Sequence, residues 1–310
     1  MYKLGVVGLG TIFQYYEAAV EKNPEISLVA FCDKKRGNEI SKKYKVPFYT
    51  DYRVMMDKQK LDAVVILTPN QTHYEIVNYA LKKQIHVLCE KPLGITVSEC
   101  ERIARLAYTQ KTIVMTAFHR RYNRYIVQLR KKIKATDRLQ SIHVRYFEDI
   151  NVHSGGENWY VDPMKSGGGC VLDNGINIFD LILDFVPDPV VESGQLRYQE
   201  NKLEVEASIK LICKRLNARI TVDLSWVSAE EIKDITITTS TDQMSADMLA
   251  GFPSLKGSLW HEYEGVVNDF VQLLKHKSRA FFDWRSLKAM QLVGDVYEIT
   301  KAERLFELTI

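Results

Sequence analysis

The chain has 310 residues and a formal net charge of +3, with 46% hydrophobic and 26% charged residues. These values are typical of a globular protein of one or two domains and exclude a disordered, collagen-like or disulfide-stapled chain. The basic residues are spread along the chain, and the densest cluster, residues 120–134, is typical of a solvated helix face, so we expect no nucleic-acid partner.

The cysteines and the chain start indicate a cellular compartment. The five cysteines are odd in number, far apart and in several cases inside apolar runs, which predicts reduced thiols in the core. From Met1 the chain enters a strand-like run without a charged leader or a cleavage site, and no apolar run is long enough to span a bilayer. We therefore expect a cytoplasmic protein that does not contact a membrane.

Up to about residue 118, short apolar runs alternate with amphipathic helical stretches. The runs are YKLGVVGLG, SLVAFCD, LDAVVILTP, IHVLCEKP and TIVMTAF. This alternation is typical of parallel strands connected by helices and buried on both faces. It predicts a doubly wound α/β domain of the Rossmann type over residues 1–118.

Beyond residue 138, longer segments alternate polar and apolar residues at period two. They are SIHVRYFEDI, VVESGQLRYQ, LEVEASIKLIC, ARITVDLSWV and DITITTST. Such strands form a sheet with one wet face, and the short polar links between them favour antiparallel pairing. With helices at about 175–185, 261–276 and 284–305, the pattern predicts a second, α+β domain over residues 119–310.

The stretch GLGTIF follows the first strand and opens a helix. Gly8 and Gly10 can form the tight turn that lets backbone N–H groups, with Thr11 and Ile12 at the helix start, face a pyrophosphate. Phe13 stands where this fingerprint usually has a third Gly or Ala, so the motif alone is a weak signal, and a plain glycine turn is the alternative.

Asp33 ends the second strand, where a carboxylate can accept hydrogen bonds from an adenosine ribose. This acid repels a 2′-phosphate and favours NAD, whereas Lys34, Lys35 and Arg36 offset the repulsion and would admit NADP. Two further polar stretches, TPNQTH and CEKPLG, follow later strands, at the edge where open parallel sheets bind ligands. The cofactor-binding residues predicted from these stretches are Thr68, Pro69, Asn70, His73, Glu90 and Lys91.

Together with AFHRRYN at 117–123 and GGGCVLDNGINIFD at 167–180, these motifs resemble the Gfo/Idh/MocA oxidoreductase family. The resemblance spans both halves of the chain. It implies a Rossmann domain, a C-terminal domain with an open, mostly antiparallel sheet that often builds homodimers or homotetramers, and NAD(P)-dependent oxidation or reduction of sugars, polyols and related cyclic compounds.

The resemblance also implies site residues. Lys91 of EKP is similar to the family's catalytic lysine, and Asp173 to the acid that begins its second motif. Asn177 departs from the family, which commonly has a histidine there, and an amide cannot exchange a proton near neutral pH. The glycine triplet would let the chain pass close to the nicotinamide and the substrate.

Removing a hydride from a secondary alcohol carbon leaves a hydroxyl proton, so the chemistry needs a base. Lys91 is the first candidate and Asp173 the second, with Tyr160 and His153 behind them. The alternative for Asp173 is an N-cap of the helix that begins near residue 175. In this reading Asn177 holds a substrate hydroxyl.

Substrate contacts are also predicted for Arg120, whose guanidinium offers a fork of donors to hydroxyls or phosphates, and for Trp159, whose ring offers an apolar wall to a sugar. Arg121 offers the same donors as Arg120. The histidines have no recognisable ligand spacing and the cysteines form no pairs, so we predict no metal.

Two other functions remain open. One is a nucleotide-binding sensor that has lost the chemistry, which Asn177 favours. The other is an enzyme in which NAD stays bound and is recycled, so that the net reaction is epimerisation, elimination or hydrolysis.

Overall fold

The computed structural model describes residues 1–35, 38–134, 137–154, 159–200, 202–252, 255–276 and 280–307. The chain divides into two compact units, Met1–His119 with Leu259–Leu287, and Arg120–Ser258 with Lys288–Ile310. The first junction lies between His119 and Arg120, and residues 259–287 return to the first unit. The domain boundary at residue 118 stays a prediction.

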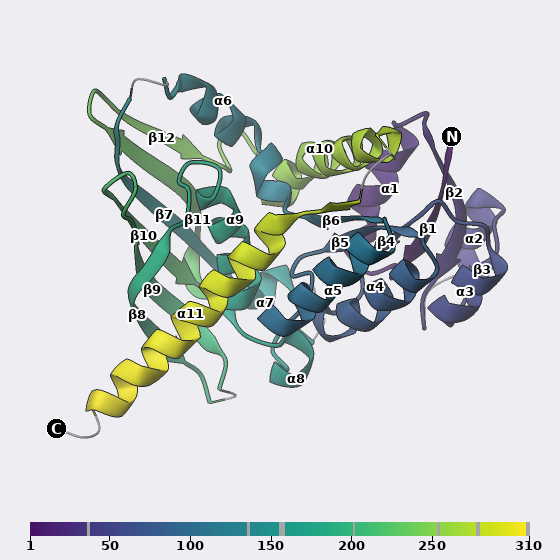
Figure 1. The fold of residues 1–310 in the computed structure, drawn as a ribbon, viewed down its shortest axis with the longest axis horizontal. Helices are drawn as coiled ribbons and strands as arrows, with labels where there is room; N and C mark the ends of the chain where they lie inside the picture. The colour runs from purple at the N-terminus through teal and green to yellow at the C-terminus, as the bar shows by residue number, and fades with distance from the viewer. Residues whose placement is uncertain are drawn as a thin grey trace. The chain divides into compact units, whose positions relative to one another are not determined.

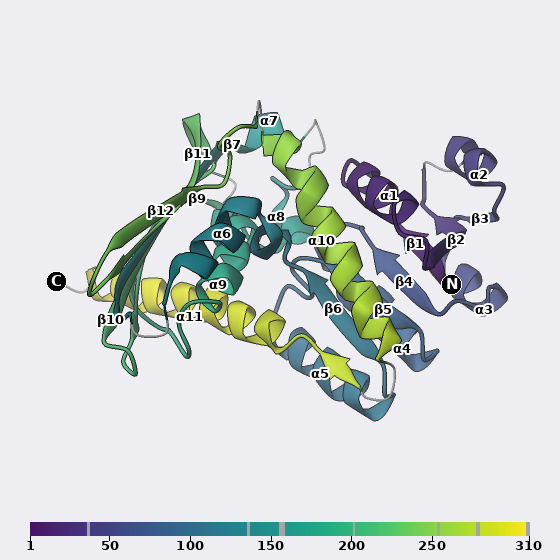
Figure 2. The ribbon, with the colours of Figure 1, turned by 90° about the horizontal axis from the view of Figure 1, so that it is seen from above.

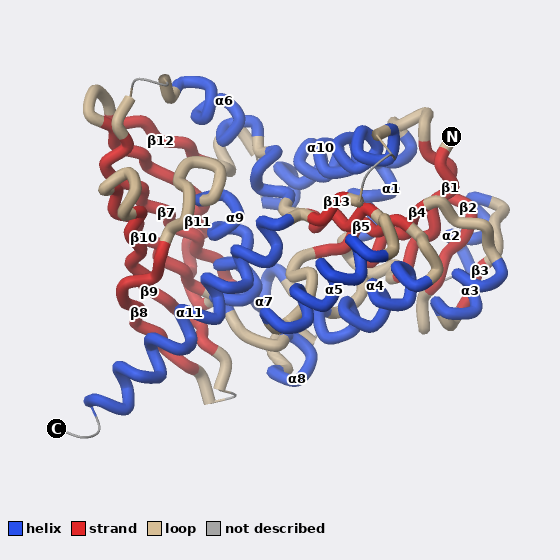
Figure 3. Tube along the Cα trace, in the orientation of Figure 1, coloured by secondary structure: helices blue, strands red, loops and turns tan. Residues whose placement is uncertain are grey.

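In the described part of the first unit, seven parallel strands form a sheet in the order β13-β6-β5-β4-β1-β2-β3 (Figures 1 and 3). The strands are β1 (Tyr2–Val7), β2 (Ile26–Cys32), β3 (Phe48–Tyr49), β4 (Ala63–Ile66), β5 (His86–Glu90), β6 (Ile113–Ala117) and β13 (Phe281–Phe282). The helices are α1 (Phe13–Glu21), α2 (Asn38–Tyr44), α3 (Tyr52–Lys58), α4 (His73–Lys82), α5 (Val97–Thr109) and most of α10 (Leu255–Lys275), with the short 3-10 segment η1 (Asn70–Thr72).

Helices cover both faces of this sheet, which is why its central strands are apolar throughout. Every residue of β4 and β6 is buried. In Figure 1, α1 and α10 lie on one face and α4 and α5 on the other. The late segment belongs here because β13 pairs with β6 and because Tyr263 of α10 packs against the rings of Tyr15 and Tyr16. This fold confirms the predicted Rossmann architecture.

The described strands of the second unit form a six-stranded sheet in the order β12-β11-β7-β10-β9-β8. They are β7 (Leu139–Asp149), β8 (Val190–Tyr198), β9 (Glu204–Cys213), β10 (Ala218–Ser225), β11 (Val227–Thr239) and β12 (Gln243–Asp247). Its helical segments are most of η2 (His119–Tyr122), α6 (Arg124–Lys132), α7 (Ile150–His153), α8 (Pro163–Ser166), the π-turn η3 (Val171–Gly175), α9 (Ile176–Ile182) and most of α11 (Trp284–Glu307). The sheet is mostly antiparallel, as predicted, except that β10 runs parallel to β7.

The period-two pattern places one face of this sheet against helices and the other against solvent. Figure 2 shows α6 and α9 on one side of the strands. On the opposite face, His143 lies 2.8 Å from Asp223 of the neighbouring strand, and Arg145 donates to Asp234 at 3.1 Å. The alternation within β7, where Ile142 is buried and His143 is exposed, confirms the predicted wet face.

All five cysteines are buried and free, as the sequence predicts. Burial raises the pKa of the thiols of Cys32 and Cys100 to about 12, so these two stay protonated and pack as small hydrophobic groups.

Candidate functional site

The carboxyl ends of β1, β2, β4 and β5 meet at one edge of the first unit's sheet. The chain passes from β1 to β2 and β3 on one side, and continues with β4, β5 and β6 on the other. Open parallel sheets bind their ligands where this reversal occurs, between β1 and β4. The glycine turn follows β1, and the TPNQTH stretch follows β4, so the structure brings these two predicted segments together.

Gly8 sits at a position that only glycine can fill. Its backbone has a φ of +97°, and a Cβ there would lie 2.7 Å from the carbonyl carbon of Leu67, just after β4. Its N–H donates to the carbonyl oxygen of Cys32 at 2.8 Å. The turn is thereby fixed against the ends of the strands on both sides of β1.

Asp33 closes the same turn. Its Oδ2 accepts a hydrogen bond from the N–H of Leu9 at 2.8 Å, and its Oδ1 accepts one from the N–H of Lys35 at 2.7 Å. A carboxylate oxygen can accept more than one hydrogen bond. The carboxylate is therefore placed beside the glycine turn, as a ribose-binding acid must be.

Phe13 explains how the fold proceeds without the third glycine of the fingerprint. Its ring is 4% exposed and packs edge-on against Phe31 of β2, with ring centroids 5.7 Å apart. An aromatic contact replaces the close backbone approach between helix and strand. The N-terminus of α1, at Ile12, has no side-chain cap, and the N–H groups of Phe13 and Tyr15 donate to the carbonyl oxygens of Gly10 and Ile12. The dipole of such a helix end favours an anion.

His73 joins the two polar stretches and is itself fully buried. Its Nε2 lies 2.6 Å from the carbonyl oxygen of Thr68, and its Nδ1 lies 2.7 Å from the carbonyl oxygen of Pro92. Burial lowers the pKa of His73, although the two backbone contacts oppose this shift. Because both ring nitrogens already face carbonyl groups, we assign His73 to joining these loops and do not propose that it contacts the cofactor directly.

Glu90 is a buried acid next to the predicted catalytic lysine. It is 8% exposed, and the hydroxyl of Tyr16 donates to its Oε1 at 2.7 Å. Burial raises the pKa of Glu90, while Tyr16 and the charge of Lys91 act in the opposite direction. Tyr16 lies on α1, 74 residues from Glu90, and no motif around it indicates this contact.

In the second unit, Asp173 and Asn177 lie on a continuous helical segment. The π-turn Val171–Gly175 runs directly into α9. Such turns are rare and occur often at functional sites. Because a π-turn contains more residues per turn than an α-helix, residues four apart across it lie nearly on the same face. The predicted N-cap role of Asp173 is wrong, since the N-cap position of α9 is Gly175 and has no side-chain hydrogen bond.

Asn177 has an unusual environment. Its side chain is 2% exposed, and its Oδ1 has no hydrogen-bond partner among the described residues. A buried amide oxygen without a donor costs free energy, so its presence in a folded core suggests that a ligand supplies the donor. Asp173 is 7% exposed.

Arg120 and Arg121, predicted from the sequence as substrate contacts, form hydrogen bonds inside the second unit. Arg120 is 1% exposed and donates to the hydroxyl of Tyr146 at 2.7 Å. Arg121 pairs with the fully buried Asp180, with its Nε donating to Oδ2 at 3.0 Å. The Arg120 guanidinium thus donates to a buried hydroxyl, and the Arg121 guanidinium neutralises a buried carboxylate. We therefore do not include Arg120 in the proposed substrate site.

Trp159 stacks on Tyr160, with ring centroids 3.8 Å apart, and both rings are partly exposed. The side chain of His153 and residues 155–158 lie outside the described residues.

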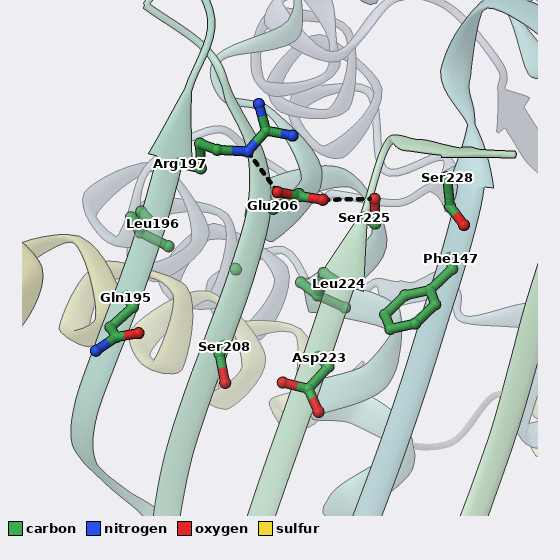
Figure 4. Close-up of a pocket in the computed structure, with 11 residues that line it drawn as sticks. Phe147, Gln195, Leu196, Arg197, Glu206, Ser208, Asp223, Leu224, Ser225 and Ser228 are labelled. Carbon is green, nitrogen blue, oxygen red and sulfur yellow. Dashed lines mark hydrogen bonds and ion pairs between the residues drawn. The ribbon is translucent and has the colours of Figure 1, made fainter.

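The pocket drawn in Figure 4 lies on the sheet of the second unit, on the face opposite to helices α6 and α9. It occupies the polar face of β8, β9, β10 and β7, and is lined by residues that include Gln195, Ser208 and Asp223. Glu206 pairs there with Arg197 and accepts from Ser225. None of the residues predicted from the motifs lines it, so we do not place the candidate site there.

In the described ranges, no helix combines the length and the apolar character needed to cross a membrane. No group of three or more His, Cys, Asp or Glu side chains suited to a metal ion occurs within those same ranges.

Comparison with known proteins identifies the family. Residues 2–118 match the oxidoreductase family model with the NAD-binding Rossmann fold, GFO_IDH_MocA. Residues 127–244 match the GFO/IDH/MocA C-terminal domain. The chain therefore belongs to the GFO/IDH/MocA family of oxidoreductases, and its first unit is an NAD-binding Rossmann domain.

Individual relatives share about a quarter of the aligned residues. A D-glucoside 3-dehydrogenase of Escherichia coli is 27% identical over 197 residues, which cover 62% of this chain and 56% of that protein. A galactose 1-dehydrogenase of Pseudomonas fluorescens is 27% identical over 311 residues, covering 95% and 94%. A crystal structure of D-galactose-1-dehydrogenase from Rhizobium etli superposes with a TM-score of 0.82 at 25% identity, covering 96% and 94%. The chain spans about half the length of the first curated relatives that it matches.

Proposed function

We propose that this protein is an NAD-dependent dehydrogenase or reductase that transfers a hydride between the nicotinamide and a secondary alcohol or ketone of a sugar, cyclitol or sugar derivative. The observation that carries the proposal is the convergence at one sheet edge of the glycine turn, Asp33 and the strand end that bears Lys91. The family membership supports the reaction class, and the named relatives support the substrate class.

The residues present fit a bound dinucleotide. The uncapped N-terminus of α1 suits the pyrophosphate, and the Asp33 carboxylate suits the adenosine ribose hydroxyls. Thr68, Pro69 and Asn70 follow β4 on the other side of the β1–β4 reversal and would contact the remainder of the molecule. When bound, the nicotinamide accepts or supplies the hydride.

Three side chains act on the substrate in this proposal. Lys91 hydrogen-bonds the reacting oxygen and takes or returns its proton. Asp173 orients the substrate by accepting a hydrogen bond from a hydroxyl other than the reacting one. Asn177 holds a second donor of the substrate through its Oδ1, which has no partner within the described ranges, and takes no proton, because an amide does not titrate near neutral pH.

The test is cofactor reduction over a panel that contains D-glucosides, D-galactose and myo-inositol, each with NAD and with NADP. We expect turnover with NAD by the wild type and a loss of at least about 100-fold in Lys91→Ala, the range over which a positioned proton-transfer group acts. Lys60→Ala, at an exposed loop lysine, is the control and should match the wild type. Equal turnover in Lys91→Ala would remove this lysine from the mechanism.

The amide at position 177 supports a second candidate function, that of a sensor that binds NAD without turning over a substrate. Tight NAD binding without turnover of any panel compound, in both the wild type and Asn177→His, would support the sensor. Turnover that appears only in Asn177→His would show that the site is intact and lacks only a group that exchanges a proton.

We also propose that copies of the chain assemble into a dimer or tetramer through the polar face of the second sheet. That face carries alternating charges, such as Arg145 and Asp234, rather than a uniform field. Light scattering checks the mass in solution, and Thr236→Lys on the same face of β11 should lower it. A monomeric wild type would refute this assembly.

A further inference from the structure

A single buried carboxylate oxygen holds the beginning of the segment that carries Asp173. Oε1 of Glu204, at the start of β9, accepts hydrogen bonds from the N–H of Gly169 at 2.8 Å, from the N–H of Val171 at 3.2 Å and from the hydroxyl of Tyr297 at 2.6 Å. Glu204 is 3% exposed. The strand, the glycine segment and helix α11 are thus joined at one atom.

The glycines of this segment are explained by the same contact. A Cβ at Gly169 would lie 2.0 Å from the carbonyl oxygen of Glu204, and a Cβ at Gly168 would lie 2.6 Å from the hydroxyl oxygen of Tyr297. Neither position has room for any side chain. The protein's own atoms therefore fill the space beside these glycines, where the sequence predicts an approach to the nicotinamide and substrate.

The other end of the π-turn is held by a second buried acid. Asn174 donates through Nδ2 to Oε1 of Glu148 on β7 at 3.0 Å. Lys233, on the neighbouring strand β11 and 0% exposed, donates to Oε2 of the same carboxylate at 2.6 Å and neutralises it. Asp173 lies between the two held positions, Val171 and Asn174.

Burial favours the proton on Tyr297, so this residue acts as a donor. Burial raises the pKa of Tyr297 well above its usual value, and the charge of Glu204 adds to the shift. Burial also raises the pKa of Glu204, while the hydrogen bonds from Tyr297 and the backbone oppose it. Because Glu204 is buried, these three donors take the place of the hydrogen bonds that water makes to an exposed carboxylate.

We propose that Glu204 and Tyr297 are positioning residues, whose hydrogen bonds to each other and to the glycine segment fix the π-turn so that Asp173 and Asn177 are correctly oriented. The catalytic consequence depends on the proposed function. The structural part, an immobilised segment 167–175, does not depend on it.

The experiment compares Tyr297→Phe with Thr300→Val. Tyr297→Phe removes one hydroxyl donor to Glu204 and keeps the ring. Thr300→Val removes a hydroxyl one turn further along α11 that bonds, among the described residues, to two carbonyl groups of its own helix, those of Val296 and Tyr297. Both variants lose one hydroxyl from the same helix, and only the first contacts the glycine segment.

The first readout is amide hydrogen exchange of the peptide that covers residues 167–175, measured without ligands. We expect Tyr297→Phe to raise its exchange rate about 10-fold, the effect of one hydrogen bond to a charged group, and Thr300→Val to leave the rate unchanged. Glu204→Ala should raise the rate further, and Glu204→Gln, which keeps an acceptor oxygen, should restore part of the protection. Unchanged exchange in Tyr297→Phe would overturn the proposal, whether or not Glu204→Ala folds.

The second readout separates positioning from stability. With NAD and whichever panel sugar the wild type oxidises, Tyr297→Phe should lower kcat about 10-fold, with KM for the sugar and Kd for NAD unchanged. Faster exchange with an unchanged kcat would overturn the positioning role and leave a purely structural contact. If the wild type oxidises no panel compound, the proposed function fails, and the exchange data alone then decide whether Glu204 and Tyr297 immobilise the segment.

Discussion

The hydroxyl of Tyr16 donates a 2.7 Å hydrogen bond to Glu90, so helix α1, which opens with the glycine turn, is tied to the strand end that carries Lys91. Tyr16 is 1% exposed, and its ring packs on that of Tyr263 with centroids 4.8 Å apart. The acid of the EKP segment is therefore an internal group of the first unit. A buried acid of this kind makes stability depend on pH.

Glu90→Gln should change how stability varies with pH. Burial raises the folded-state pKa of Glu90 above its ordinary value of 4.5, so the folded protein keeps a proton that the unfolded chain releases. The wild type therefore loses stability as the pH rises from about 4.5 toward the raised pKa, and Glu90→Gln lacks this loss. The melting temperature of the wild type minus that of the variant should fall over this range.

Tyr16→Phe is a control that should change the pH dependence of stability in the direction opposite to Glu90→Gln. It removes a hydrogen bond that lowers the pKa of Glu90, so the loss of stability with rising pH should be larger than in the wild type. Glu204, whose pKa burial also raises, is present in all three proteins and cancels in the differences. A temperature difference that stays constant from pH 4.5 to 8 would contradict the prediction.

Asp33→Asn should weaken NAD binding and reduce the preference for NAD over NADP. The substitution removes the charge that holds ribose hydroxyls and repels a 2′-phosphate, so we expect the Kd for NAD to rise about 10-fold and that for NADP to change less. Asp62→Asn is the matched control, because Asp62 also accepts a backbone N–H, from Lys3, but precedes β4 instead of following β2. Calorimetry with both cofactors measures the effect, and an unchanged NAD affinity would exclude Asp33 as a ribose contact.

Sequence patterns predicted those features whose cause is local. Apolar runs such as AVVI of β4 and the alternation in β7 identified the two sheets. The glycine turn and Asp33 were recognised because each belongs to a known sequence motif. Strand β13 escaped prediction because two residues are too few to show a period.

The contacts around Glu204 escaped prediction for a different reason. Tyr297 and Glu204 lie 93 residues apart, and each sits in an ordinary pattern for its own helix or strand. The buried roles of Arg120 and Arg121 were missed in the same way, since only the fold shows that Tyr146 and Asp180 lie beside them. Sequence shows which side chains have a given chemistry, whereas tertiary packing decides which of them a ligand can reach.

Gly169→Ala should be far more damaging than Gly175→Ala, although both lie in the same segment. A Cβ at Gly169 would lie 2.0 Å from a backbone oxygen, whereas one at Gly175 would lie 3.1 Å from a terminal methyl group of Leu224. We expect Gly169→Ala to lower stability by several kcal/mol or to prevent folding, and Gly175→Ala to change it by about 1 kcal/mol or less. Denaturant titration measures both, and similar losses would mean that Gly169 is not pressed against Glu204.

Asn177→Leu should stabilise the ligand-free protein while abolishing turnover. Its Oδ1 is buried without a donor among the described residues, and replacing such a group by an apolar one of similar shape removes a desolvation cost of about 1–3 kcal/mol. For a chain of this size, each kcal/mol corresponds to about 2–4 °C, so the melting temperature should rise by several degrees. Asn177→Ala leaves a cavity and should not show this gain.

The melting temperatures of the wild type and Asn177→Leu, measured without and with a bound sugar, decide whether Asn177 binds a ligand or only packs in the fold. A buried oxygen without a donor gives no advantage to a residue that only packs. In a ligand-binding residue it lowers the stability of the free protein, and the ligand removes this cost when it binds. A bound sugar with a hydroxyl donor for Oδ1 should therefore stabilise the wild type more than Asn177→Leu. If Asn177→Leu melts at or below the wild-type temperature without ligand, the amide oxygen already has a partner inside the protein, and its proposed contact with a substrate hydroxyl fails.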